Sequence, residues 1–336
     1  MKIGNLNTKD KVIIVAEIGN NHEGDYNLAE ELIALASDSG ADAVKFQTFK
    51  TEDYISITDK KRFKLIKSFE LNKYQFRSLS KYATEKQLSF ISTPFDIESA
   101  SYLDEIVDAI KISSSDNNFF PLLKTVAEGN SPIIMSTGLL NIDDLQTSIN
   151  YIVSKAKNKN LKEKLAILHC VTSYPTKPKY ANLNAIKTLK RKLNYTIGYS
   201  DHTLGLNAAI TSVGLGARII EKHFTKDKNL SDFQDHKISA NPDEFNQMVR
   251  SIREVEIMLG SGEKNLQPPE NLIKESVRRS IIAKRDIKKG TRLSESDISW
   301  VRPGGGIPSE ETSNIIGKKL KENILMGQKI LYQNLL

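Results

Sequence analysis

The stretch Asp42-Ala43-Val44-Lys45-Phe46-Gln47-Thr48-Phe49 decides the fold, because it is one of eight runs built on the same plan. Each run is short, rich in apolar residues and bounded by polar residues, glycine or proline. That pattern is typical of a strand buried on both faces of a parallel sheet. The eight runs are Val12–Ile18, Asp42–Phe49, Ser89–Phe95, Ala109–Ser115, Pro132–Gly138, Leu165–Val171, Tyr195–His202 and Arg218–Phe224.

Stretches with helical periodicity separate these runs. Leu28, Leu32 and Leu35 share one helix face, as do Phe245 and Met248 near the end of the region. Eight strand–helix units in about 260 residues predict an α/β protein of the (β/α)8 TIM-barrel class. The alternative is a doubly wound sheet, but no Gly-x-Gly-x-x-Gly motif follows the first run.

The composition changes near Gly260. Residues 261–276 are mostly polar and include two prolines, so they are predicted to be a linker. After them come a short strand at Arg279–Ala283 and a glycine-rich loop at Trp300–Gly306. We therefore predict a barrel domain over 1–260, a linker over 261–276 and a small β-rich domain over 277–336.

Composition and cysteine content limit the class of protein. The chain has 336 residues, of which 39% are hydrophobic and 26% charged, close to the values for soluble globular proteins. No stretch has the roughly 18 apolar residues of a membrane span, and Met1–Lys11 lacks an apolar signal region. The single cysteine, Cys170, excludes an intrachain disulfide and a multi-cysteine zinc site. We expect a reduced, cytoplasmic protein with no membrane partner.

The charge balance leaves two interpretations to compare. Lys and Arg number 48 against 41 Asp and Glu, a net charge of +7. The excess could form a groove for nucleic acid, or a lysine-rich surface around an enzyme site that binds anions. The lysines are scattered and no basic motif is interleaved with aromatic residues, so we expect no nucleic-acid partner.

Rare polar residues gather at the ends of the eight runs, which in a barrel surround the active site. All five histidines lie at or just after a run. His202 and His223 end neighbouring runs, and adjacent strands lie about 5 Å apart. Two imidazoles with water and oxygen donors suit Mn²⁺, Co²⁺, Fe²⁺ or Zn²⁺. For a lone histidine such as His169 a packed core residue is an equal alternative, and His22 could simply brace the first loop.

Two lysines lie inside apolar runs, Lys45 and Lys111. A buried lysine is costly without an anion. The partner could be a strand carboxylate, Glu17 or Glu221, or a phosphate or carboxylate of a ligand. Hydroxyl groups that could help to bind such an anion are those of Thr93, Ser114, Ser136 and Ser200. Glu17 and Glu221 are candidates for proton transfer. The residues alone predict a metal-assisted enzyme that acts on a phosphorylated or carboxylated small molecule.

Taken together, these motifs resemble the sialic acid synthase family: N-acetylneuraminate synthases and their legionaminate and pseudaminate relatives. The match extends over nearly the whole chain, and the tail from Arg278 to Ile307 resembles the antifreeze-like SAF domain of those enzymes. The matching segments are Ala16-Glu17-Ile18-Gly19-Asn20-Asn21-His22, Asp42 to Phe49, Ser92-Thr93-Pro94-Phe95, Ser136-Thr137-Gly138, Gly198-Tyr199-Ser200-Asp201-His202-Thr203 and Glu221-Lys222-His223-Phe224-Thr225.

The resemblance implies a (β/α)8 barrel, a C-terminal SAF domain and a domain-swapped homodimer. It implies condensation of phosphoenolpyruvate with an N-acylated amino sugar to give a nine-carbon 2-keto sugar acid and phosphate. The expected cofactor is a divalent metal, Mn²⁺ first, with Mg²⁺ or Co²⁺ as alternatives. The acceptor could be N-acetylmannosamine or a 6-deoxy diacetamido hexose, and residues 116–119 favour the N-acetylneuraminate type.

The resemblance also assigns residues. His202 and His223 match the metal ligands, and Glu17, Glu221 and Lys111 are the expected catalytic groups. The phosphoenolpyruvate contacts match Lys45, Thr93, Lys111, Ser114, Ser136 and Ser200. The sugar contacts match Gln47, Tyr174 and Asp235, together with Arg302 reaching in from the partner's SAF domain. Asp116 and Thr172 border the substrates and depart from the pattern of many relatives, which leaves the sugar open.

Two other functions stay possible from the sequence. A 3-deoxy sugar-acid phosphate synthase would need further basic residues for a second phosphate, and the SAF-like tail argues against it. A carbohydrate- or ice-binding protein would need a flat, uncharged, threonine-rich face, whereas the tail carries Lys284, Arg285, Lys288 and Lys289.

Overall fold

The computed structural model describes residues 1–157 and 163–336. The chain divides into two compact units, Met1–Gly260 and Ser261–Leu336. Among the described residues, no helix is both long and apolar enough to cross a membrane.

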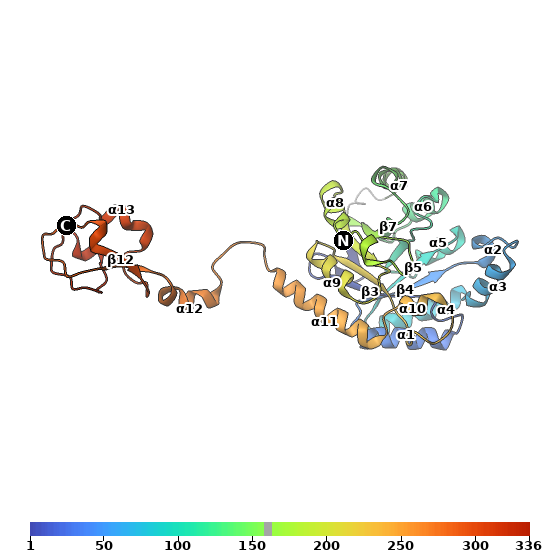
Figure 1. Ribbon diagram of the computed structural model, residues 1–336. Coiled ribbons are helices and arrows are strands. Elements are labelled where there is room, and N and C mark those ends of the chain that lie inside the picture. The colour runs from blue at the N-terminus through green and yellow to red at the C-terminus, as the bar shows by residue number, and fades with distance from the viewer. Residues whose placement is uncertain (158–162) are drawn as a thin grey trace. The chain divides into compact units, whose positions relative to one another are not determined.

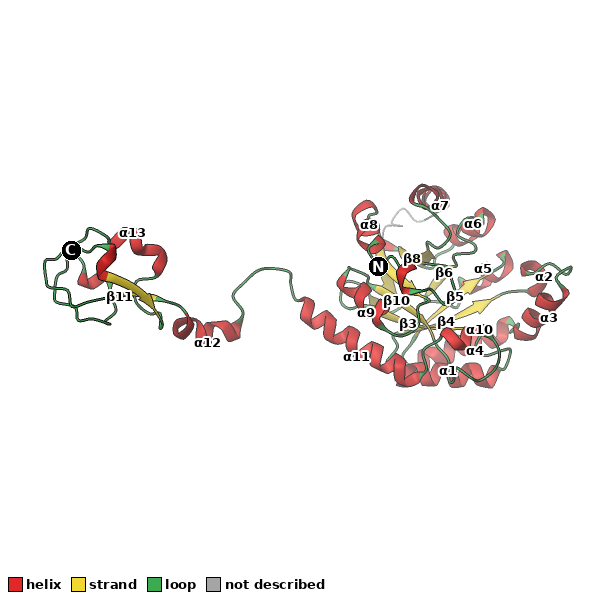
Figure 2. Cartoon of the chain, in the orientation of Figure 1, coloured by secondary structure: helices red, strands yellow, loops and turns green. Residues whose placement is uncertain are grey.

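The first unit is a closed barrel of parallel strands ringed by helices (Figures 1 and 2). The predicted (β/α)8 architecture is confirmed, and each of the eight predicted runs overlaps one strand of the barrel. The strands are β3 (Ile13–Gly19), β4 (Ala43–Thr48), β5 (Ser89–Pro94), β6 (Ala109–Ile112), β7 (Ile133–Ser136), β8 (Leu165–Cys170), β9 (Thr196–Asp201) and β10 (Ile219–His223).

The helices of this unit follow the strands in alternation, and several begin at an Asn or Asp cap. Asn72 and Asn241, for example, form capping boxes that satisfy the free amides of the first turn. The helices are α1 (Tyr26–Asp38), α2 (Thr51–Tyr54), α3 (Lys60–Phe69), α4 (Lys73–Glu85), α5 (Ile97–Leu103), α6 (Phe120–Glu128), α7 (Ile142–Lys155), α8 (Ala185–Lys192), α9 (Asn207–Gly214), α10 (Gln234–Ile238) and α11 (Pro242–Leu259), with a 3₁₀ turn η2 at Pro178–Tyr180.

Alternation along each strand creates two apolar layers. In β3, Ile14 packs in the outer layer between strands and helices, whereas Ile13 and Val15 belong to the inner layer inside the barrel. Successive side chains of a strand point to opposite faces, so Glu17 continues the inward series of Ile13 and Val15. The pattern that fills the barrel therefore delivers a carboxylate to its upper end.

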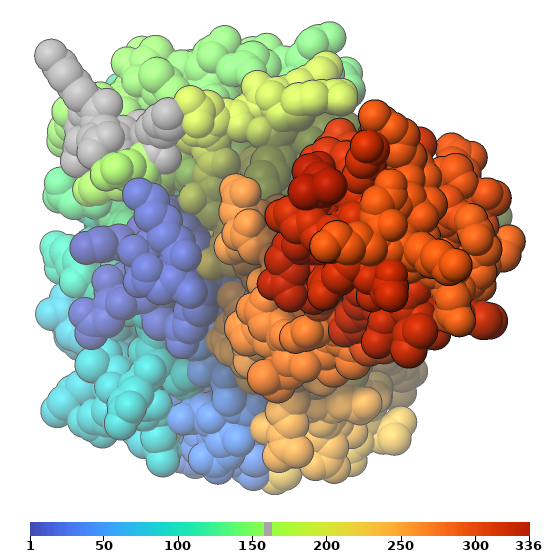
Figure 3. All heavy atoms as spheres, turned by 90° about the vertical axis from the view of Figure 1, so that its left-hand side faces the viewer, coloured from blue at the N-terminus to red at the C-terminus, as the bar shows by residue number. Residues whose placement is uncertain are grey.

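A hairpin that the sequence did not predict closes the other end of the barrel. Strands β1 (Lys2–Ile3) and β2 (Leu6–Asn7) pair antiparallel, and Ile3 packs with Ile13 and Ile219 at the starts of barrel strands. Figure 3 shows this N-terminal segment, in dark blue, as part of the surface of the first unit. The hairpin therefore covers the N-terminal ends of these strands.

The second unit has its own apolar core. It contains α12 (Pro268–Val277), β11 (Ser280–Ala283), β12 (Ile298–Val301), α13 (Thr312–Ile315) and three 3₁₀ turns, η3 (Glu295–Asp297), η4 (Ser309–Glu311) and η5 (Tyr332–Asn334). Strands β11 and β12 pair antiparallel, and Ile281, Ile287 and Leu320 are among the residues of the core. The segment predicted as a linker thus includes a helix, which starts with prolines in its first turn, where proline is tolerated.

Candidate active site

A cavity of about 690 Å³ opens at the C-terminal ends of the barrel strands. Asp116, which was predicted for the site, does not line it, and Arg302 belongs to the second unit, which is described by itself. The predicted residues that it does bring together are Glu17, Lys45, Gln47, Thr93, Lys111, Ser114, Ser136, Thr172, Tyr174, Ser200, His202, Glu221, His223 and Asp235.

Strand register explains why these residues meet. Glu17 is paired in register with Lys45, and Ser200 with Glu221. Residues two apart on one strand point the same way, so Lys45 with Gln47 and Glu221 with His223 share the cavity side. Closure of the sheet also pairs His223 with Glu17, although the two residues are 206 positions apart in sequence (223 − 17).

A buried lysine bridges two carboxylates at the base of the cavity. The Nζ atom of Lys45 lies 3.2 Å from Oε2 of Glu17 and 3.3 Å from Oε2 of Glu221. It also donates a hydrogen bond to Oγ1 of Thr93 at 3.3 Å. Lys45 therefore pairs with the two strand carboxylates that the sequence offered as one possible partner for it.

The pKa values of the two carboxylates are shifted in opposite directions. Burial raises the pKa of Glu17, and the negative charge of Glu221 adds to that effect against the attraction of Lys45. Burial acts in the same direction on Glu221, but Lys111, Lys45 and the hydrogen bond from Ser200 at 2.8 Å outweigh it and lower its pKa. Two carboxylates whose pKa values are pushed apart are a usual arrangement for acid and base roles.

The second buried lysine lacks a carboxylate partner. Lys111 donates hydrogen bonds to Oγ of Ser136 at 2.6 Å and to the carbonyl oxygen of Ile112 at 3.0 Å. Within residues 1–157 and 163–336 it makes no ion pair. Burial lowers its pKa to about 8. A cation held in this way is available to an incoming anion.

Two buried hydroxyl groups of the cavity have few partners among the described residues. Oγ1 of Thr172 has no hydrogen-bond partner there, and Oγ of Ser114 has only the Cys170 thiol next to it. Both crowd Gly138, because a Cβ atom built there would lie 2.6 Å from Oγ of Ser114 and 2.2 Å from Oγ1 of Thr172. Buried polar groups without partners are unusual, so this corner of the cavity is arranged for a hydrogen-bonding ligand.

The two rim histidines suit a divalent metal. Their ring centroids are 5.5 Å apart, and Nδ1 of His202 pairs with the carbonyl oxygen of Val171 at 2.9 Å, which leaves its Nε2 for a ligand. Nδ1 of His223 is buried without a hydrogen bond, 4.0 Å from Oδ2 of Asp235. In the described part of the chain no three His, Cys, Asp or Glu residues form a metal-binding group. An ion bound here would need water or substrate oxygens as further ligands.

The other histidines support loops. His169 pairs with the carbonyl oxygen of Ala181 at 2.8 Å and does not line the cavity. His22 accepts a hydrogen bond from the amide of Gly24 at 3.0 Å, within the first loop. His236 lies between Thr225 and Glu23, at 2.7 and 2.8 Å, and fixes the helical turn that carries Asp235.

Asp116 and Arg302 are held elsewhere. The Asp116 carboxylate accepts hydrogen bonds from the hydroxyls of Ser113 at 2.6 Å and Ser115 at 2.8 Å. Arg302 belongs to the second unit, where its Nε donates to the carbonyl oxygen of Val277 at 2.7 Å. Their predicted contacts with substrate stay predictions.

Sequence reasoning missed one wall of the cavity. Tyr54, Arg62, Leu65 and Ile66 line it from helices α2 and α3, together with other unpredicted residues that include Phe233. The sequence did contain a signal for this wall. The segment 50–88 between the second and third predicted strands is longer than a single barrel helix requires, so it had to contain additional structure. Nothing in their pattern identified which of them would face the cavity.

Comparison with known proteins places this geometry in a family. The model of the NeuB family matches residues 32–264, and that of the SAF domain matches residues 278–336. An uncharacterised protein of Methanocaldococcus jannaschii is 44% identical over 100% of this chain and 98% of its own length. The N,N'-diacetyllegionaminic acid synthase of Legionella pneumophila is 39% identical over 96% of this chain and 94% of its own.

A solved structure agrees. The N-acetylneuraminic acid (sialic acid) synthetase of Leptospira borgpetersenii superposes with a TM-score of 0.75 and 36% identity, covering 82% of this chain and 95% of its own. The similarity therefore extends from sequence to fold across the barrel that carries the cavity.

Proposed function

The chain belongs to the NeuB family, and on that premise we propose that it is a nonulosonic acid synthase. It condenses phosphoenolpyruvate with an N-acylated amino sugar to give a nine-carbon 2-keto sugar acid and phosphate. Candidate acceptors are N-acetylmannosamine, the N-acetylneuraminate synthase reaction that the sequence favours, and a 6-deoxy diacetamido hexose.

One observation carries the proposal. Two buried lysines, several hydroxyl groups and two carboxylates line a single cavity, and the pKa values of the two carboxylates are shifted in opposite directions. Lys111, which makes no ion pair with the described residues and lines the cavity together with Ser114, is suited to the phosphate or carboxylate of phosphoenolpyruvate. Lys45 would exchange part of its contact with Glu17 and Glu221 for the same substrate. These contacts hold a small, multiply charged anion in one orientation, which is an entropic contribution to catalysis.

The carboxylates then serve the proton transfers. C3 of phosphoenolpyruvate attacks the aldehyde carbon of the acceptor, water adds at C2, and the C–O bond to phosphate breaks. Glu17, whose pKa is raised by burial, is our candidate to position that water and take its proton. Glu221, kept ionised by Lys111 and Lys45, would stabilise the positive charge that develops at C2.

A divalent ion on His202 and His223, Mn²⁺ first, would polarise the aldehyde oxygen when bound. Gln47, Tyr174 and Asp235 line the cavity and are placed to contact sugar hydroxyls. Gln47 is itself oriented by a hydrogen bond from Asn20 at 2.8 Å and donates to Glu17 at 3.3 Å, so a substrate contact at this residue would reach the catalytic carboxylate.

We also propose a domain-swapped homodimer in the cytoplasm. The single cysteine, Cys170, is free and buried, which fits a reducing compartment. Leu272 of α12 is 88% exposed and Ile257 of α11 81%, an exposure of large apolar side chains that a partner subunit would cover. In such a dimer Arg302 would reach the partner's cavity.

Phosphate release with product mass tests the function. The wild-type protein, loaded with Mn²⁺, is given phosphoenolpyruvate with N-acetylmannosamine, a 6-deoxy diacetamido hexose or arabinose 5-phosphate. Release with an amino sugar, together with the mass of a nine-carbon keto acid, is the expected result. Release with arabinose 5-phosphate alone would replace the proposal by a 3-deoxy sugar-acid phosphate synthase.

A further inference from the structure

The cavity has two chemically different sides. Its deep side, formed by the strand ends, carries Lys45, Lys111 and the serine hydroxyls. Its outer side is formed by α3 and by aromatic residues: Leu65 and Ile66 line it together with Phe95 and Phe233. A multiply charged substrate belongs on the deep side, so the outer side is left for the acceptor.

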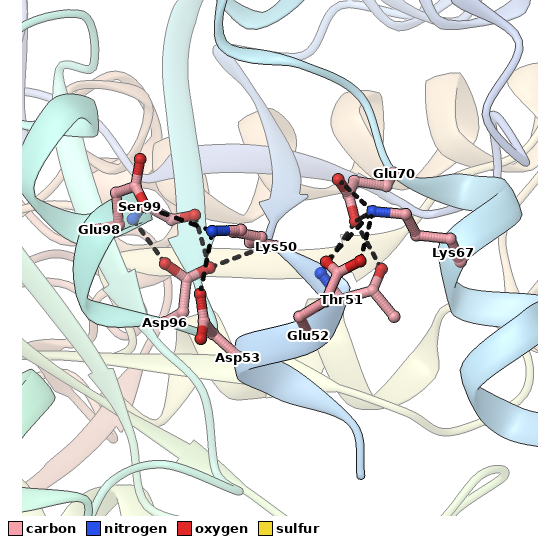
Figure 4. Close-up of polar contacts among 9 residues, drawn as sticks. All are labelled: Lys50, Thr51, Glu52, Asp53, Lys67, Glu70, Asp96, Glu98 and Ser99. Atoms are coloured by element: carbon pink, nitrogen blue, oxygen red, sulfur yellow. Dashed lines mark hydrogen bonds and ion pairs between the residues drawn. The ribbon is translucent and has the colours of Figure 1, made fainter. Parts of the chain in front are cut away.

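The outer side is held in place at its base (Figure 4). The Asp96 carboxylate accepts hydrogen bonds from the amides of Lys50 at 2.8 Å and Ser99 at 2.7 Å. The Glu70 carboxylate accepts from the amide and hydroxyl of Thr51 at 2.8 and 2.6 Å, at the start of α2. The start of the segment that carries α2 and α3 is thus joined to Asp96, just after β5. Thr51 and Glu70 in turn join the two ends of the segment to each other.

Lysine and aromatic contacts strengthen this frame. Nζ of Lys67 lies 3.0 Å from the carboxylates of both Glu52 and Glu70 (Figure 4). The ring of Tyr54 stacks on Phe95 with centroids 4.5 Å apart, and that of Phe69 meets Phe233 at 5.0 Å. Because this wall is already ordered, it loses little conformational entropy when it binds a ligand group.

Arg62 is the unassigned cation of this wall. It lines the cavity from α3, is in hydrogen-bonding contact with the Tyr54 hydroxyl, and forms no ion pair with any residue that the structure describes. Beside it lie the exposed apolar side chain of Leu65 and the half-buried one of Ile66. A guanidinium next to aliphatic groups offers hydrogen bonds to a carbonyl oxygen and packing to a methyl group, the two parts of an N-acyl group.

The charges around Arg62 argue against a phosphorylated acceptor. Burial raises the pKa of Tyr54, and the negative charges of Asp116 and Asp235 raise it further, while Arg62 opposes them. Two carboxylates therefore lie in the neighbourhood of one guanidinium. Carboxylates near the guanidinium disfavour a phosphate dianion at this position more than they disfavour a neutral amide.

We propose that the α2–α3 wall selects the acceptor by binding a second N-acyl group, with Arg62 donating to its carbonyl oxygen and Leu65 and Ile66 packing on its methyl group. The inference rests on the proposed function and narrows it to a 6-deoxy diacetamido hexose as the preferred acceptor. Arg62 is then a specificity-determining residue.

The test compares Arg62→Met, which keeps an unbranched apolar stem, with the wild type and with Lys61→Met. Lys61 is an exposed lysine on the same helix that does not line the cavity, so its variant controls for loss of one positive charge. Steady-state kinetics are measured with 6-deoxy diacetamido hexose, N-acetylmannosamine and N-acetylmannosamine 6-phosphate, each with saturating phosphoenolpyruvate and Mn²⁺.

We expect wild type and Lys61→Met to prefer the diacetamido sugar. In Arg62→Met its kcat/KM should fall about tenfold, as for a lost charged hydrogen bond, with less change for N-acetylmannosamine. The KM for phosphoenolpyruvate should stay within about twofold, which separates a contact with the acceptor from a disturbed fold. Arg62→Lys should lie between wild type and Arg62→Met.

Two results would overturn the inference alone: an active wild type that prefers either mannosamine compound, or an acceptor preference that Arg62→Met leaves unchanged. Failure of the wild type to release phosphate with any acceptor would overturn the proposed function, and this inference with it.

Discussion

The two units treat buried charge in opposite ways. In the barrel, Glu17, Lys45, Lys111 and Glu221 are each no more than 6% exposed and meet in one cavity. The second unit packs an aliphatic core, and its buried carboxylate, Asp297, is paired with Arg285 at its edge. Burying charge is costly unless a partner or ligand compensates. The comparison indicates that the clustered buried charges, and with them the proposed chemistry, lie in the barrel.

The largest effect should follow from removing the lysine that bridges the two carboxylates. Lys45→Met leaves Glu17 and Glu221 facing each other without their cation, so we expect a loss of about 3 kcal/mol in the free energy of unfolding. The value of kcat/KM for phosphoenolpyruvate should fall by about 10³-fold. Denaturant unfolding and phosphate release measure the two changes.

Lys222 provides a matched control for this comparison. It is 2% exposed and pairs with Asp201 at 2.9 Å, but it does not line the cavity. Lys222→Met should destabilise by a similar amount and reduce activity far less than Lys45→Met. Equal losses of activity in the two variants would mean that Lys45 acts only through folding.

Truncating a core side chain of the second unit should lower the stability of that unit and leave the barrel unaffected. Ile281 is fully buried in its aliphatic core, and Ile281→Ala should cost about 2–4 kcal/mol through lost burial and a cavity. Calorimetry should show one unfolding transition moved to lower temperature and the other, from the barrel, unchanged. A barrel transition that moves by the same amount would contradict two independently stable units.

A smaller effect concerns pH. Burial lowers the pKa of Lys111 from 10.5 to about 8, so the free enzyme loses this cation as pH rises through that value. We expect kcat/KM for phosphoenolpyruvate to decline above about pH 8 and Lys111→Arg, which stays charged, to remove that decline. An identical decline in both proteins would assign it to another group.

The same shift predicts how stability varies with pH. Between about 8 and 10.5 the unfolded chain holds the Lys111 proton that the folded chain has released. The contribution of this residue to the free energy of unfolding should therefore rise with pH across that window. Denaturant titrations of wild type and Lys111→Met over the window measure it, and equal slopes would contradict the assignment.

The smallest effect should come from the second unit's arginine. If Arg302 contacts the sugar in the partner's cavity, Arg302→Ala should raise the KM for the acceptor about tenfold without changing the unfolding of either unit. Mixed dimers of Arg302→Ala and His223→Ala should then recover part of the activity. No recovery in verified mixed dimers would mean that the second unit does not act on its partner.

The fold was predictable because its signal is local and repeated. Each barrel strand is an apolar run, and alternation along a run such as β3 carries inner residues, outer residues and finally Glu17 to their places. The site followed from the same rule, since strand ends converge in a barrel. Lys45, Gln47, His202 and His223 could be grouped before their distances were known.

Two kinds of feature could not be predicted: the conformations of loops, and the choice of a buried lysine between several possible ion-pair partners. Nothing in the sequence decides that Lys45 takes both carboxylates while Lys111 takes neither, because that choice depends on three-dimensional distances of a few ångströms. The cavity side of α3 depends on how Asp96 and Glu70 anchor the segment before it. Asp116 lies just after strand β6, where site residues were expected. Its carboxylate instead accepts hydrogen bonds from the hydroxyls of the neighbouring Ser113 and Ser115.

The crowding at Gly138 has an evolutionary consequence. Any side chain there would collide with Ser114 and Thr172 unless both shifted, so a mutation at this position is coupled to two neighbouring residues. Substitutions on the deep side of the pocket are therefore a difficult way to change the preferred sugar. The exposed residues of α3 can vary one at a time, which makes that helix the accessible route by which descendants of this enzyme would change substrate.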